Sequence, residues 1–186
     1  LDLMQDLVKI GTTAPSGTNS QSWNFIILPT RSDVEGFGTM IGDYYRRLNR
    51  LASNPFLRAL VKVVGGDSLG RYYRNHYQSV QRALNLWDEG GEDRLFHGAV
   101  AAILVTGKTD ASCPVEDSML ATQNILLAAH SVGLGSCLIG FGVEAMRRSS
   151  SIKKKMECGA DEEIHAVIGL GYPAVRYQRP APRREV

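Results

Sequence analysis

The chain has 186 residues, of which 44% are hydrophobic and 22% are charged. This composition suits one globular domain with a core of ordinary size, and it excludes an intrinsically disordered chain. Because 21 Lys and Arg residues nearly balance 19 Asp and Glu residues, we expect no nucleic-acid partner, which would require a concentrated basic surface. No apolar run approaches the roughly 20 residues that cross a bilayer, so we expect no membrane partner. The three cysteines lack Cys-x-x-Cys spacing and fit a reducing compartment, so the cytoplasm is the expected location.

The N-terminal part of the chain predicts helices around a single strand. Apolar residues at helical spacing predict a helix over residues 3–10, and a loop of small residues follows at 12–20. Residues 24–28 have the composition of a strand. A longer helical pattern covers 33–64, with a break at Asn54-Pro55 because proline disfavours helix at the residue before it.

The middle of the chain predicts an amphipathic helix over 72–87 and a buried strand over 99–106, where an unbroken apolar run is typical of a strand covered on both faces. A helix over 114–132 begins at a proline, with Glu116 and Asp117 complementing its dipole. Because apolar residues lie on nearly every face of this helix, we expect it to be deeply buried.

The C-terminal part predicts a short strand over 136–139, a helix over 144–156 and a buried strand over 164–170, followed by a tail rich in Pro and Arg. This alternation predicts a single α/β domain over residues 1–186, with a small mixed sheet between layers of helices in a three-layer sandwich. The apolar helix needs more cover than one chain of this size provides, so we also expect a homodimer.

Two short motifs suggest other functions. Residues 66–70 match the nucleophile elbow of serine hydrolases, with Ser68 as nucleophile and Asp117 and His165 as later triad partners. That fold needs several strands before the serine, and only one is predicted, so we favour a glycine-rich turn. Residues 140–145 match a dinucleotide-binding fingerprint, but no acid closes the next strand to hold a ribose.

The histidines and tyrosines carry weaker signals. The four histidines show no metal-ligand spacing, so we predict no metal site. Five tyrosines fall at helical spacings, which is typical of packing, although flat rings can also form a wall of a pocket for a planar substrate. They are Tyr44, Tyr45, Tyr72, Tyr73 and Tyr77.

Three separated segments carry a family resemblance. The first is Ala-Pro-Ser-Gly-Thr-Asn-Ser-Gln-Ser-Trp at 14–23, the second runs from Gln-Asn at 123–124 to Leu-Ile-Gly at 138–140, and the third is Ile-Gly-Leu-Gly-Tyr-Pro at 168–173. In this order and spacing they resemble the nitroreductase family of flavoproteins over nearly the whole chain. The first segment is close to that family's Ala-Pro-Ser-x-x-Asn-x-Gln-Pro-Trp loop.

The resemblance implies an FMN cofactor and the residues that bind it. The first segment corresponds to a loop around the flavin, and a backbone N–H of the second stabilises negative charge on the reduced ring. Arginines after the third segment correspond to a phosphate contact. The implied cofactor-binding residues are Pro15, Ser16, Gly17, Asn19, Gln21, Leu138, Ile139, Gly140, Arg183 and Arg184.

The chain departs from the family pattern at three places. An Arg-Arg-Ser-x-Arg segment that supplies most phosphate contacts in the family is not found after Leu1, and we expect it upstream. Ser22 stands where proline is usual. The stretch 36–94 is least similar to the family, and we expect it to shape the substrate pocket.

The resemblance also implies a reaction. NAD(P)H reduces FMN and leaves, and a small planar acceptor such as a nitroaromatic or a quinone then takes the electrons, in a ping-pong cycle. The cofactor supplies the chemistry, so no catalytic acid, base or nucleophile is named. Both subunits of the dimer build each flavin site. Deiodination, flavin cleavage and a ferredoxin-linked reductase stay open on the same scaffold, and a serine hydrolase using Ser68 or a flavin-binding module without turnover are alternatives of other classes.

Overall fold

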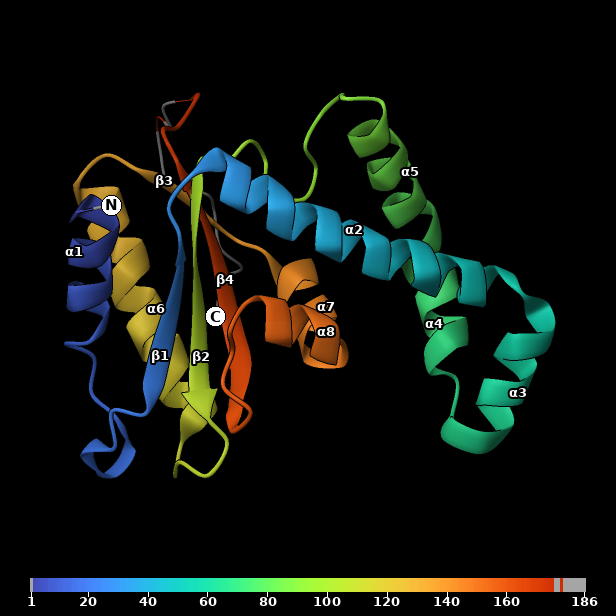
Figure 1. Ribbon diagram of the computed structural model, residues 1–186, viewed down its shortest axis with the longest axis horizontal. Helices are drawn as coiled ribbons and strands as arrows, with labels where there is room; N and C mark the ends of the chain where they lie inside the picture. Colours follow the sequence, from blue (N-terminus) through green and yellow to red (C-terminus); the bar gives the residue numbers. More distant parts are fainter. Residues whose placement is uncertain (1, 176–177, 179–186) are drawn as a thin grey trace.

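A four-stranded sheet forms the centre of the computed structural model, which describes residues 2–175 and residue 178 (Figure 1). The strand order is β1-β2-β4-β3, and the strands span Trp23–Leu28 (β1), Ala101–Lys108 (β2), Gly135–Leu138 (β3) and Glu162–Gly171 (β4). Every pairing among these described strands is antiparallel, so the prediction of a mixed sheet is wrong. The long connections between the strands permit either direction, and the strand patterns alone do not distinguish them.

Helices cover both faces of the sheet, as the sequence predicts (Figure 1). On one face lie α1 (Asp2–Gly11) and α6 (Pro114–Ser131), and on the other lie α2 (Arg31–Ser53), α7 (Gly140–Arg148) and α8 (Ser150–Lys155). Alternate residues of β2 enter two separate cores: Ile103 packs on the α1–α6 side and Leu104 on the α2–α7 side, and both are fully buried. The three-layer sandwich is therefore confirmed, with β2 and β4 buried on both faces.

Three short helices form a helical protrusion (residues 55–88) at the C-terminal end of α2 (Figure 1). They are α3 (Pro55–Gly65), α4 (Ser68–Asn75) and α5 (Tyr77–Asp88). The predicted break at Asn54 is confirmed, and its side-chain oxygen accepts hydrogen bonds from the N–H groups of Phe56 and Leu57.

Two predicted helices are each divided in the structure. The helix predicted over 72–87 is interrupted at His76, whose backbone leaves the helical region at φ −129° and ψ −25°. The helix predicted over 144–156 is interrupted at Ser149, whose side chain accepts a hydrogen bond from the N–H of Ile152 and so begins α8. Neither break has a glycine or proline to mark it, which is why spacing alone predicts continuous helices.

The deep burial expected for α6 is only half correct. The side toward the sheet is buried, with Ile125 fully inaccessible, but the opposite side exposes apolar residues, among them Leu127 at 59%. We call this exposed set the α6 stripe; it consists of Val115, Met119, Leu120 and Leu127. None of the helices in the described part of the chain is both long and apolar enough to cross a membrane.

Candidate functional site

The loop at residues 12–22 adopts an unusual backbone. Thr18, Asn19 and Gln21 have φ values of 53°, 54° and 49°, in the left-handed region that residues other than glycine seldom adopt. Within the loop, the N–H of Gln21 donates to Ser16 Oγ at 3.0 Å, and Gln21 Nε2 donates to Asn19 Oδ1 at 2.9 Å. Such strain persists where the surroundings hold it, and it is concentrated at functional sites.

A single buried carboxylate holds this loop against the start of α6. Asp117 is 3% exposed; its Oδ1 accepts from the N–H of Gly17 at 2.9 Å and its Oδ2 from Ser20 Oγ at 3.3 Å. A Cβ at Gly17 would lie 2.8 Å from Ser112 Oγ, so any larger residue here would force the Ser112 side chain to move. The sequence relates Asp117 to the helix dipole and to the hydrolase alternative but not to the 12–22 loop, because a contact across 100 residues leaves no local signal.

The segment 138–141, which joins β3 to α7, has free donors and open space. The N–H of Ile139 donates to Val167 O at 2.8 Å. Within the described residues, the N–H groups of Gly140 and Phe141 have no acceptor, because the first turn of a helix lacks internal partners. A Cβ built on Gly140 meets nothing within 4 Å. Two free N–H groups beside open space fit a flat group that accumulates negative charge.

A cavity of about 1000 Å³ lies beside the 138–141 segment. The stretch least similar to the family supplies much of its lining, and the rings that gather there are Tyr44, Tyr45, Tyr72, His76 and Phe141. We call it the aromatic cavity. The rings of Tyr45 and Tyr72 are stacked at 6.4 Å, and Phe141 meets Tyr45 edge to face at 5.5 Å. Flat ligands stack favourably on such faces.

The two phenols at the centre of this ring cluster are hydrogen-bonded within the protein. Tyr45 Oη donates to the carbonyl oxygen of Phe141 at 3.2 Å, and Tyr72 Oη donates to Asn49 Oδ1 at 2.7 Å. Burial raises the pKa of both phenols above their usual range, so they remain neutral. The cavity therefore presents ring faces rather than free hydroxyl groups at this point.

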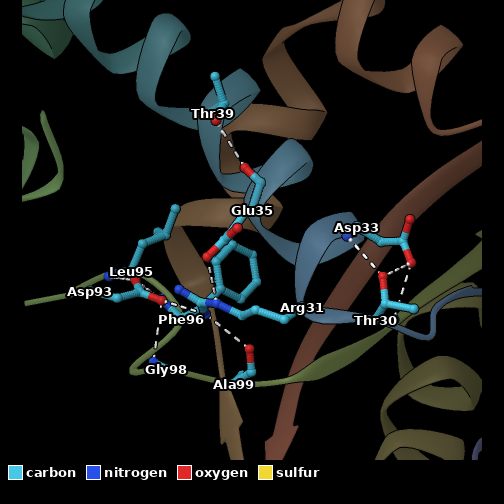
Figure 2. A network of polar contacts seen from close by, with 10 residues as sticks. All are labelled: Thr30, Arg31, Asp33, Glu35, Thr39, Asp93, Leu95, Phe96, Gly98 and Ala99. Atoms are coloured by element: carbon cyan, nitrogen blue, oxygen red, sulfur yellow. Dashed lines mark hydrogen bonds and ion pairs between the residues drawn. The ribbon is translucent and has the colours of Figure 1, made fainter. Parts of the chain in front are cut away.

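The 89–99 segment, which returns from the protrusion to β2, is fixed by a second carboxylate (Figure 2). Asp93 accepts from the N–H groups of Leu95, Phe96 and Gly98 at 3.0, 2.8 and 3.2 Å. Arg31 donates to Asp93 Oδ2 at 2.9 Å. Although burial alone would raise it, these donors hold the pKa of Asp93 below its usual range. The network positions the residues at 94–97 that close one side of the aromatic cavity.

The predicted site residues form two groups rather than one. Pro15, Ser16, Gly17, Asn19 and Gln21 share the 12–22 loop, which leads into the edge strand β1, whereas Leu138, Ile139 and Gly140 follow the opposite edge strand β3. Three strand spacings, roughly 14 Å, separate these edges. No described residue of the loop lines the aromatic cavity. The predicted phosphate contacts Arg183 and Arg184 lie outside the described residues.

The residues of the hydrolase alternative do not come together. Ser68 begins α4 and borders the aromatic cavity, while the carboxylate of Asp117 binds the 12–22 loop. His165 is an extra residue at a bulge in β4, where its Nδ1 lies 3.4 Å from the guanidinium of Arg147. Burial and the Arg147 charge lower the pKa of His165.

Comparisons with known proteins show what the chain is similar to. A model described as the Nitroreductase family matches residues 1–172. An Archaeoglobus fulgidus protein named as an NADH dehydrogenase/NAD(P)H nitroreductase is 23% identical over 176 residues, which cover 91% of this chain and 72% of that protein. A Desulfitobacterium hafniense nitroreductase crystallised with bound FMN has a TM-score of 0.66 at 21% identity, covering 98% of this chain and 82% of the other.

Iodotyrosine deiodinase, solved with FMN and 3-iodo-L-tyrosine, has a TM-score of 0.54 at 22% identity, over 98% of this chain and 85% of that one. At these identities the solved structures share the fold with this chain. Because a deiodinase is among them, the fold alone does not determine the reaction.

Proposed function

The chain belongs to the nitroreductase family, and from that membership we propose that it is an FMN-dependent oxidoreductase that passes electrons from NAD(P)H to a small planar acceptor such as a nitroaromatic or a quinone. The observation that carries the proposal is the aromatic cavity beside the free N–H groups of Gly140 and Phe141. FMN supplies reversible two-electron chemistry, so that a donor and an acceptor can react in turn at one site.

The residues of the chain bind and orient in this proposal rather than transfer protons. The N–H groups at the start of α7 stabilise negative charge at the flavin ring, since they lie at the positive end of the helix dipole. Leu138 and Ile139 pack against the ring, and the faces of Tyr45, Tyr72 and Phe141 receive a flat substrate. Arg183 and Arg184 bind the flavin phosphate.

We propose that a second copy of the chain completes the site. The 12–22 loop and the 138–141 segment lie at opposite edges of the sheet in one chain, so a shared site brings the loop of one subunit to the cavity of the other. The α6 stripe leaves apolar surface for such a partner to cover. We further propose a cytoplasmic location, because the three cysteines are free and persist as thiols in a reducing compartment.

The direct test is reconstitution of the purified full-length protein with excess FMN. We expect one FMN for each chain, released unchanged on denaturation, and oxidation of NADH or NADPH that depends on menadione or a nitroaromatic. Recovery of FAD, or of no flavin, would contradict the proposal. Light scattering at micromolar concentration should show a dimer. A stable flavin-loaded monomer would refute the proposal that two subunits share each site.

The phosphate contact has a test of its own. Substituting Arg183 and Arg184 with Ala should weaken FMN binding about ten-fold or more and leave riboflavin, which lacks the phosphate, almost unaffected. High salt should narrow the difference between wild type and variant. Flavin fluorescence quenching measures both affinities, and an unchanged FMN-to-riboflavin ratio would remove both arginines from the site.

A further inference from the structure

The aromatic cavity has an unbalanced set of charges. Three guanidinium groups, those of Arg71, Arg94 and Arg148, line it together with a single carboxylate, that of Glu144. The lining therefore carries more positive than negative charge at neutral pH. An apolar cavity bordered by one sign of charge concentrates ligands of the opposite sign.

The three arginines differ in their partners. Arg148 pairs with Glu144, and Arg94 pairs with Glu92 at 3.2 Å. Arg71, in contrast, makes no side-chain hydrogen bond or ion pair with any residue between 2 and 175. Its neighbour on α4, Arg74, already takes the nearby carboxylate of Asp67 at 2.6 Å. Arg71 is thus the cavity guanidinium with its donors free for a ligand.

The rest of the lining indicates what the ligand carries besides charge. Tyr45 and Tyr72 use their hydroxyl groups internally, so they offer ring faces. A guanidinium binds a carboxylate or sulfonate through two parallel hydrogen bonds, and no described cavity carboxylate other than the paired Glu144 would repel such a group. A flat ring with an anionic substituent matches both features.

We infer that the acceptor of the proposed oxidoreductase is a nitroaromatic or a quinone that also carries an anionic substituent, with its ring on the Tyr45–Tyr72–Phe141 side of the cavity and its anionic group on Arg71; the nitro group or quinone takes the electrons, and the anionic group serves only in binding. This inference rests on the proposed function. Arg71 is then a specificity-determining residue, which acts on substrate binding and leaves the electron transfer to the cofactor.

The test compares 4-nitrobenzoate with its neutral methyl ester in the FMN-loaded wild type, in Arg71→Gln and in the control Arg74→Gln, which changes a paired arginine of the same helix outside the cavity lining. Arg71→Gln should lower kcat/KM for the acid about ten-fold, mainly through KM, and leave the ester within two-fold. Arg74→Gln should change neither. The acid-to-ester ratio, compared between variants, cancels the different reactivities of the two compounds.

Two outcomes would overturn the inference and leave the proposed function standing. One is turnover of both acceptors with the same acid-to-ester ratio in wild type and Arg71→Gln. The other is a slower reduction of the flavin by NADPH in Arg71→Gln, measured by stopped flow, with an unchanged kcat/KM for 4-nitrobenzoate. That result would assign Arg71 to the phosphates of the donor. Absence of bound flavin, or of NAD(P)H oxidation with the ester and with menadione, would instead refute the proposed function and this inference with it.

Discussion

Two segments of the molecule are each held by one carboxylate, a buried one at Asp117 and a partly buried one at Asp93, and the two segments are held differently. Asp93 accepts hydrogen bonds from three backbone N–H groups of the 89–99 segment and forms an ion pair with Arg31 (Figure 2). Asp117 accepts one backbone N–H and one hydroxyl of the 12–22 loop. The cavity side is thus fixed by four donors, whereas the loop that we assign to the flavin is fixed by two.

Because the two carboxylates have different partners, we expect Asp93 to matter mainly for the stability of the domain and Asp117 mainly for what the 12–22 loop binds. Loss of Asp93 would leave three N–H groups without an acceptor and would leave Arg31 only Glu35 and the carbonyl of Ala99 as partners, which lowers the stability of the whole domain. Loss of Asp117 would release an exposed loop whose backbone is already strained, so its main effect should fall on whatever the loop binds.

Asp93→Ala should have the largest effect, a loss of about 3 kcal/mol in the free energy of unfolding, because it removes the acceptor for a partly buried arginine and three amides. That corresponds to a fall of about 10 °C in Tm for a domain of this size, measured by calorimetry. Glu35→Ala is the matched control, since it removes the other, more exposed partner of Arg31 and should cost under about 0.5 kcal/mol. Equal losses in the two variants would refute the assigned role of Asp93.

Asp117→Ala should weaken FMN binding by ten-fold or more, since each hydrogen bond to a charged group contributes about 1.5–3 kcal/mol. Asp117→Asn keeps an acceptor for the N–H of Gly17 and should recover about half of that loss on a logarithmic scale. Fluorescence titration well below the Tm of both variants separates affinity from unfolding. If Asn and Ala bind FMN equally, the Gly17 hydrogen bond is not what positions the loop.

Gly17→Ala should cost about 1 kcal/mol, because its Cβ would lie 2.8 Å from Ser112 Oγ and 3.0 Å from Cys113 Sγ. Removing the hydroxyl with Ser112→Ala should restore part of the loss, so the two substitutions should couple in a double-mutant cycle. Urea unfolding of the four proteins measures the coupling, and strictly additive effects would mean that the loop does not pack here.

The pH dependence of stability should separate the contribution of Asp93 from that of His165, a buried histidine of β4. The pKa of His165, near the start of α6, is lowered by burial and by the charge of Arg147, so the unfolded chain binds more protons below about pH 6.5, and stability is lost as the pH falls from there toward the folded pKa. The lowered pKa of Asp93 means that its contribution is complete above about pH 3.9 and is lost only below that. Between pH 7 and 5, the urea midpoint of His165→Gln should therefore change less with pH than that of wild type. Parallel pH profiles of the two midpoints would contradict this.

For Ser68 we expect no reaction with a serine-hydrolase probe. Ser68 borders the cavity without a histidine or carboxylate partner within the described residues, so an active-site fluorophosphonate probe should not label the protein. Intact-mass measurement after prolonged incubation checks this, with a known serine hydrolase as the positive control. A single adduct mapped to Ser68 would restore the hydrolase alternative.

Much of the fold follows from local patterns in the sequence. The unbroken apolar run at 99–106 matches β2, and proline marks both the start of α6 and the break between α2 and α3. The break at His76 and the strand directions depend on tertiary packing, which leaves no residue signature nearby. Apolar spacing also does not tell which side of α6 packs on the sheet and which is exposed, because it does not distinguish a core from a surface that a partner covers.

The sequence predicts which segments form the site, but not how these segments contact one another in space. The 12–22 loop and the 138–140 segment are visible as motifs, because each is a continuous run of residue types. The roles of Asp117, Asp93 and Arg71 depend on neighbours far away in the sequence or on helices outside any motif. Such roles appear only when the distances are known.

The position of β4 between β2 and β3 has a consequence for synthesis of the protein. Residues 162–171 form a central strand, yet they are the last of the four strands to leave the ribosome. Until then, β2 has an unpaired inner edge, although its apolar residues are already made, and β3 has no neighbouring strand at all. Nascent chains that stall before residue 162 should therefore depend on chaperones and aggregate when released, because an uncovered apolar strand edge pairs readily with another chain.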